Sequence, residues 1–139
     1  MPTSTSRKSS RPEDGIHLQD ILVYKKVVEQ MKTLKEEFTV LSKSKPDNPL
    51  NQLKVDIVNE RLKDANRLLV GEHKPFSSFE EFNSDRLPTN SDVLLILSEY
   101  IAALGRWRAE HVYQDALYTW HWRTLDGDVE VGQENRPHG

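Results

Sequence analysis

The residues best suited to chemistry gather near the C-terminal end of the sequence, on one side of a predicted helix. His111 and Asp115 are four positions apart, so in a helix their imidazole and carboxylate share a face. Arg108 adds a cation beside them, and the rings of Trp107 and Tyr118 can stack on a flat ligand. One hypothesis is therefore a ligand-binding site, and its candidate residues are Trp107, Arg108, His111, Asp115 and Tyr118.

The same stretch also fits the inside of a protein. Bulky residues recur at three- and four-residue steps along this helix, which is typical of a face that packs on other helices. Buried aromatic rings contribute large apolar areas to a core. The sequence favours this packing interpretation for the bulky residues, which are Leu97, Tyr100, Leu104, Trp107, His111, Tyr118 and Trp122.

A second face of this helix consists of small residues at alternating spacings of four and three. Small side chains let another helix approach closely, toward the short end of the usual separation of about 8–10 Å. A helix with one bulky face and one small face is expected to pack on two sides. We interpret the small face as a contact between two copies of the chain, and its residues are Ser98, Ala102, Gly105, Ala109, Val112 and Ala116.

Several kinds of enzyme site can be tested by their spacing. Arg106 and His111 have the Arg-x4–6-His spacing of a class of helical ribonucleases. The same spacing occurs at two other places in the chain, so it does not identify that class. A di-iron bundle needs Glu-x-x-His pairs, and this sequence has none. We expect no cofactor and no metal, and no catalytic residue is assigned.

Helical periodicity organises most of the chain. The pattern predicts helices over about 18–41, 49–70 and 91–123, with Pro46 ending the first. A 20-residue connection precedes the last helix. In it, Phe76, Phe79 and Phe82 lie three apart, which indicates a short helix laid across one end of the others.

Composition limits the class of protein. The chain has 139 residues, no cysteine and a net charge of −3. Its apolar runs are far shorter than the ~20 residues of a membrane span. Without a basic stripe, nucleic acid is not an expected partner. No targeting segment is evident, so the expected location is the cytoplasm and no membrane association is expected.

The sequence thus predicts an all-α fold: an antiparallel three-helix bundle with a short extra helix in the long loop before the last helix. Residues 16–125 form the predicted helical domain, between a flexible tail over 1–15 and a flexible acidic tail over 126–139. The function hypothesis is a small non-enzymatic interaction or structural protein that forms a homo-oligomer, a dimer, through its last helix. The alternative is a helical bundle that binds a ligand or metal, with a hydrolytic or RNA-processing activity, in the region of His111.

Overall fold

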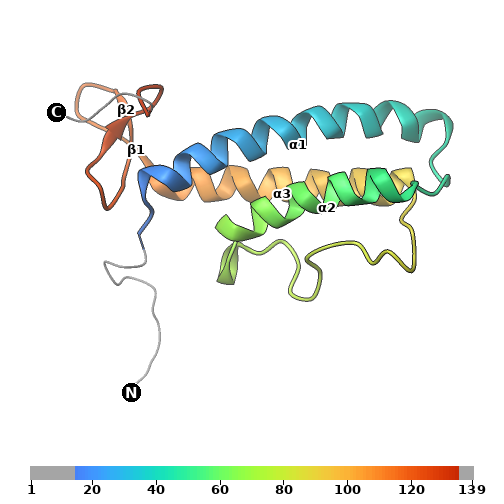
Figure 1. The fold of residues 1–139 in the computed structure, drawn as a ribbon. Helices are drawn as coiled ribbons and strands as arrows, with labels where there is room; N and C mark the ends of the chain where they lie inside the picture. Colours follow the sequence, from blue (N-terminus) through green and yellow to red (C-terminus); the bar gives the residue numbers. More distant parts are fainter. Residues whose placement is uncertain (1–14, 135–139) are drawn as a thin grey trace, which may run out of the picture. The chain divides into compact units, whose positions relative to one another are not determined.

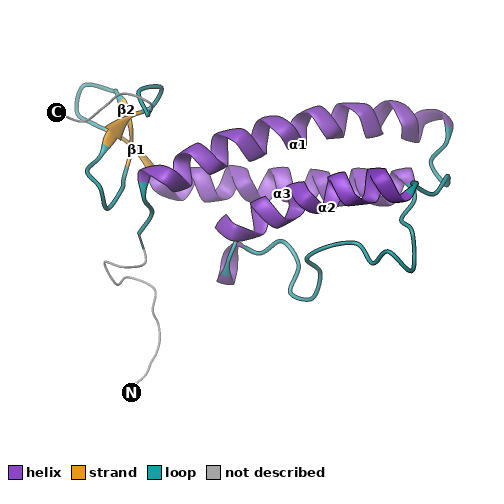
Figure 2. Ribbon diagram, viewed as in Figure 1, coloured by secondary structure: helices purple, strands orange, loops and turns teal. Residues whose placement is uncertain are grey.

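The computed structural model describes residues 15–134, which hold three α-helices and one three-stranded antiparallel sheet (Figure 1, Figure 2). The prediction of an all-α fold is therefore wrong. The chain divides into two compact units, Val23–Trp107 and the described parts of 1–22 and 108–139. The elements in chain order are α1 (Leu18–Ser44), α2 (Gln52–Leu68), the 3-10 turn η3 (Gly71–His73), α3 (Asn90–His111), β1 (Val112–Gln114), β2 (Trp120–Trp122) and β3 (Val129–Glu130).

The unit Val23–Trp107 is built from α1, α2 and α3, which run side by side (Figure 1). Tyr24 of α1 stacks on Trp107 of α3, with ring centroids 5.4 Å apart. Tyr100 of α3 donates a hydrogen bond from its hydroxyl to Asn66 Oδ1 of α2, at 2.8 Å. The buried apolar residues of the three helices include Val27, Met31, Phe38, Val55, Val58, Leu62, Ala65, Val93, Leu97, Tyr100, Leu104 and Trp107.

The bulky face of α3 is confirmed as core over its first four members. Leu97, Tyr100, Leu104 and Trp107 are all at most 3% exposed. Each such side chain contributes about 1.5–3 kcal/mol or more when it leaves water. Burial of Tyr100 also raises the pKa of its phenol, because the ionised form would lose hydration.

The long connection before α3 has no helix beyond η3, so the predicted short helix is wrong. Side chains of α2 supply the hydrogen bonds that a helix would have made within itself. Asn59 donates to Phe82 O at 2.9 Å and accepts from Phe82 N at 2.8 Å. Asn66 donates to Glu80 O at 3.0 Å. The Phe79 ring meets Phe76 and Phe82 edge-on, at 5.9 and 5.0 Å, without helical backbone.

Helix α3 ends at His111 rather than near Arg123, which is the main correction to the predicted fold. Residues 112–122 form a hairpin instead, with Val112 opposite Trp122 and Gln114 opposite Trp120. Aromatic and β-branched residues are frequent in this stretch and favour strands. Strand β3 pairs with β2 on its other side and completes the sheet, in the order β1-β2-β3.

The first turn of α1 is capped from the distant end of the same unit. The Asp126 carboxylate accepts hydrogen bonds from Leu18 N at 2.9 Å and from His17 Nδ1 at 3.1 Å. Carboxylates at a helix N-terminus satisfy unpaired N–H groups and oppose the helix dipole. Residues 126–134, assigned to a tail on sequence grounds, therefore include this cap, strand β3 and the buried Glu134.

Candidate interaction surface

The five residues of the predicted ligand site have separate surroundings. Trp107 belongs to the helical core and is 3% exposed. Arg108 places its guanidinium 5.7 Å from the centre of the Trp122 ring. His111 is half-buried at the last position of α3. Asp115 and Tyr118 lie beyond that helix, where the chain turns from β1 to β2.

The Asp115 carboxylate bridges the two sides of the hairpin turn through three hydrogen bonds. Its Oδ1 accepts from Leu117 N at 2.8 Å and from Thr119 N at 3.0 Å, and its Oδ2 lies 2.7 Å from His121 Nε2. The backbone N–H of Thr119, with His121 second, lowers the pKa of Asp115 below its usual range. A carboxylate held in this way supports the turn and holds the His121 ring beside it.

Two aromatic residues complete the hairpin surface. The Tyr113 ring stacks on the His121 ring, with centroids 5.4 Å apart. The Arg123 guanidinium lies 5.0 Å from the centre of the Tyr113 ring. Tyr113 donates its hydroxyl proton to Asp128 Oδ2 at 2.7 Å, which raises the pKa of the phenol. Tyr118 is 80% exposed at the loop tip, with a positive φ of 66° that non-glycine residues seldom adopt. The sequence did not single out His121 or Tyr113, because a continuous helix would have separated them.

The predicted face of small residues on α3 includes fewer residues than the sequence indicated. Ser98, Ala102, Gly105 and Ala109 do lie on α3, and the last three are exposed. A Cβ atom added at Gly105 would meet nothing within 4 Å. Val112 and Ala116 are not on this face, because Val112 is in β1 and Ala116 is in the turn after it. The correction has the same cause as before: the helix ends at His111.

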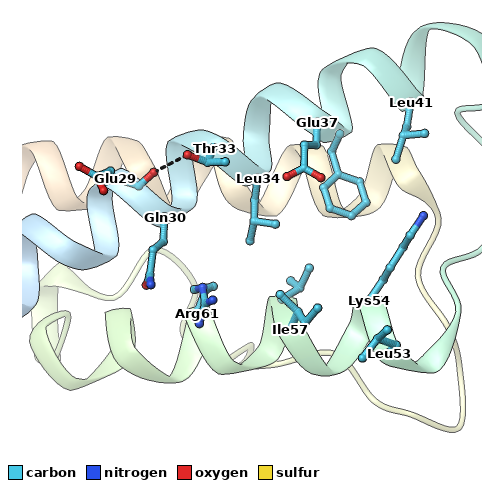
Figure 3. Close-up of a pocket in the computed structure, with 12 residues that line it drawn as sticks. Glu29, Gln30, Thr33, Leu34, Glu37, Leu41, Leu53, Lys54, Ile57 and Arg61 are labelled. Carbon is cyan, nitrogen blue, oxygen red and sulfur yellow. Dashed lines mark hydrogen bonds between the residues drawn. The ribbon is translucent and has the colours of Figure 1, made fainter.

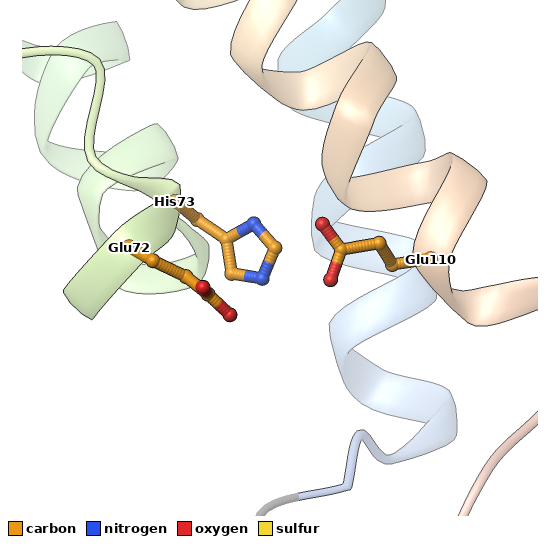
Figure 4. A group of neighbouring side chains, drawn as sticks. All are labelled: Glu72, His73 and Glu110. Carbon is orange, nitrogen blue, oxygen red and sulfur yellow. The ribbon is translucent and has the colours of Figure 1, made fainter.

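Three side chains with metal-binding atoms are drawn in Figure 4. Glu72 and His73 are neighbours in η3 and belong to the unit Val23–Trp107, whereas Glu110 on α3 belongs to the other unit. Adjacent residues in one short turn do not make a metal site. No metal site is assigned to these residues.

An open groove lies between α1 and α2, wholly within the helical unit, and has a volume of about 500 Å³ (Figure 3). Phe38 and Val58 are buried at it, whereas Leu53 is 68% and Ile57 39% exposed. Exposed apolar residues that cluster mark interaction surfaces more often than scattered ones do. The lining residues are Glu29, Gln30, Thr33, Leu34, Glu37, Phe38, Leu41, Leu53, Lys54, Ile57, Val58 and Arg61.

Charges are separated across this groove. Its acidic residues, Glu29 and Glu37, come from α1, and its basic residues, Lys54 and Arg61, come from α2. Because the two helices run in opposite directions, Glu29 lies toward the end where Arg61 lies and Glu37 toward the end where Lys54 lies (Figure 3). Within the chain, Arg61 Nη1 is 2.9 Å from Glu60 Oε1.

Sequence periodicity indicates only part of this surface. The three- and four-residue spacing of apolar residues places Leu34 and Leu41 on the apolar face of α1, and Ile57 lies beside the apolar stripe of α2. Which apolar residues stay exposed depends on where α3 packs, so periodicity alone did not reveal the groove.

Comparisons with known proteins found no relative of this chain. No family model matches it, and neither the curated proteins nor the solved structures include a significant match. Its function must therefore be inferred from its own residues.

Among the described residues, no helix combines the length and the apolar character needed to cross a membrane.

Proposed function

We propose that this chain is a non-enzymatic interaction protein that binds a helical partner in the groove between α1 and α2. The observation that carries the proposal is the open apolar groove itself, with Leu53 68% and Ile57 39% exposed beside it. Burial of apolar surface stabilises a protein by ~25 cal/mol per Å², and these exposed side chains do not make that contribution in the free chain. A partner that covers them recovers that free energy.

The shape and charges of the groove define the kind of partner. A groove between two helices accepts an amphipathic helix, whose apolar residues recur at three- and four-residue steps. Such a helix would carry basic residues where it faces Glu29 and Glu37, and acidic residues where it faces Lys54 and Arg61. Opposite charges at the rim select the partner's orientation more than they add affinity.

Two observations favour binding over catalysis. The described residues that line the groove include no histidine, cysteine or serine, and its two glutamates, Glu29 and Glu37, are exposed. In the hairpin, the Asp115 carboxylate is engaged by Leu117 N, Thr119 N and His121. These contacts give the carboxylate a structural role in the turn.

A photo-crosslinking amino acid at Leu53 tests the proposal in cells that express the full chain. The matched control carries the same amino acid at Lys63, an exposed α2 residue that is not part of the groove. We expect a protein adduct from position 53 and none from position 63. Absence of an adduct at position 53, or equal yields at both positions, would contradict a docking role for the groove.

The ligand-binding alternative has its own test. A small ligand or metal ion at about one hundred times its dissociation constant stabilises a protein by about 2.7 kcal/mol. Thermal unfolding of the purified chain with a panel of divalent metals and nucleotides should show no such shift. A reproducible rise in melting temperature would favour the alternative in the region of His111.

A further inference from the structure

We propose that the face of α1 and α2 that carries the groove binds the same face of a second copy of the chain, so that the protein is a symmetric dimer. This inference rests on the proposed function and names the helical partner: α1 and α2 of a second copy, which lie along the two rims and cover the groove from above. The argument comes from the arrangement of charges: one rim is acidic, the other is basic, and they belong to antiparallel helices. The acidic rim of one copy can therefore face the basic rim of another copy.

A two-fold axis that lies in the plane of the contact and runs along the helices brings opposite charges of the two copies together. Such an axis places α1 of each copy on α2 of the other and keeps every residue at its level along the helices. Glu29 then faces Arg61 of the second copy, and Glu37 faces Lys54 of the second copy. Because the two-fold axis repeats each of these two contacts, the dimer contains four ion pairs.

The apolar residues fit the same arrangement. Leu53 and Leu41 lie at one end of the groove, and Leu34 and Ile57 lie further along it (Figure 3). In the symmetric contact, Leu53 meets Leu41 of the second copy and Ile57 meets Leu34 of the second copy. The two most exposed apolar residues of the groove thereby leave water, and neighbouring helices run antiparallel as in many four-helix assemblies.

The other two-fold axis in the contact plane runs across the helices and gives a poor match. It would place α1 on α1, with Glu29 against Glu37 of the second copy, and Lys54 against Arg61 of the second copy. Like charges brought together in this way are unfavourable and exclude wrong arrangements. The charges therefore specify both the partner and its direction.

Charge reversal in the purified full chain tests the contact. Glu37→Lys alone, or Lys54→Glu alone, creates two like-charge contacts in each symmetric dimer. We expect each variant to dimerise roughly ten-fold or more weakly than the original chain in sedimentation equilibrium at low salt. Both residues are exposed, so circular dichroism should show unchanged helicity.

Mixing the two variants gives the decisive measurement. A Glu37→Lys chain and a Lys54→Glu chain form a mixed dimer in which every contact again joins opposite charges. We expect the mixture to dimerise as tightly as the original chain. The matched control is Glu36→Lys mixed with Lys63→Glu; these exposed residues do not line the groove, so neither variant nor mixture should change dimerisation.

The outcomes separate this inference from the proposed function. If the original chain stays monomeric at all attainable concentrations, self-association is refuted. An adduct from position 53, and not from position 63, whose crosslinked segment in the other protein is an amphipathic helix would still support the proposed function. If the chain dimerises equally tightly as the original, as each charge-reversal variant and as their mixture, the assigned contact is refuted. Should a reversal disturb the fold, the original chain crosslinked at position 53 must yield an adduct of twice its mass, and failure to do so overturns the inference.

Discussion

The indole of Trp122 donates a hydrogen bond from Nε1 to Glu134 Oε2 at 2.8 Å, and the two residues are only 1% and 6% exposed. Gly132 N donates to the same oxygen at 2.8 Å. A buried indole N–H usually needs such a partner. The last described turn of the chain therefore holds the middle strand of the sheet in place.

Glu134→Ala should destabilise the protein by about 1–3 kcal/mol, because it leaves a buried indole N–H and the Gly132 N–H without an acceptor. Urea unfolding followed by circular dichroism measures the loss. Glu134→Gln is the matched control, since its amide oxygen can still accept both hydrogen bonds, and it should lose less. Equal stability of the alanine variant and the original chain would argue against a structural role for residue 134.

Asp115 should make stability depend on pH in the acidic range. Its pKa is lowered in the folded chain, mainly by the Thr119 N–H and then by His121. Its stabilising contribution is therefore complete above its unfolded pKa of about 3.9 and is lost as pH falls through the lower folded value. The stability difference between the original chain and Asp115→Asn should be largest above about pH 5 and shrink toward about pH 2. Urea midpoints across this range measure it, and a difference that does not change with pH contradicts the assignment.

Trp107→Ala should cost about 3–5 kcal/mol, because it leaves a cavity in the core and removes the ring that stacks on Tyr24. Denaturant unfolding provides the measurement. Trp120→Ala is the comparison, since Trp120 is 48% exposed and should cost much less. Similar losses for both variants would mean that Trp107 does not anchor the helical core.

Leucine at Ala102 and Ala109 tests self-association through α3. Both alanines are exposed and leucine is a good helix former, so folding stability should not fall. Because we place the dimer contact on α1 and α2, the double variant should also keep the mass of the original chain in solution. Loss of the dimer at unchanged stability would instead assign the contact to the small face of α3, as the sequence suggested.

Local pattern was enough to predict the helical unit in outline. The three- and four-residue spacing of apolar residues indicated α1, α2 and the first part of α3, because that periodicity follows from helix geometry alone. It also placed Leu97, Tyr100, Leu104 and Trp107 in the core, where all four are buried. Side chains at these positions share a face whatever packs against them.

Beyond His111, long-range contacts decided the structure. Residues 112–122 have a spacing compatible with a helix and a composition compatible with strands, and local pattern could not choose between them. The hairpin is supported by β3, by the Glu134 carboxylate on Trp122, and by Asp115 in its turn. The Asp126 carboxylate that caps Leu18 comes from 108 positions away. Exposure of Leu53 and Ile57 likewise depends on the side of α2 that α3 covers. Such partners are distant in sequence, so only the tertiary structure brings them together.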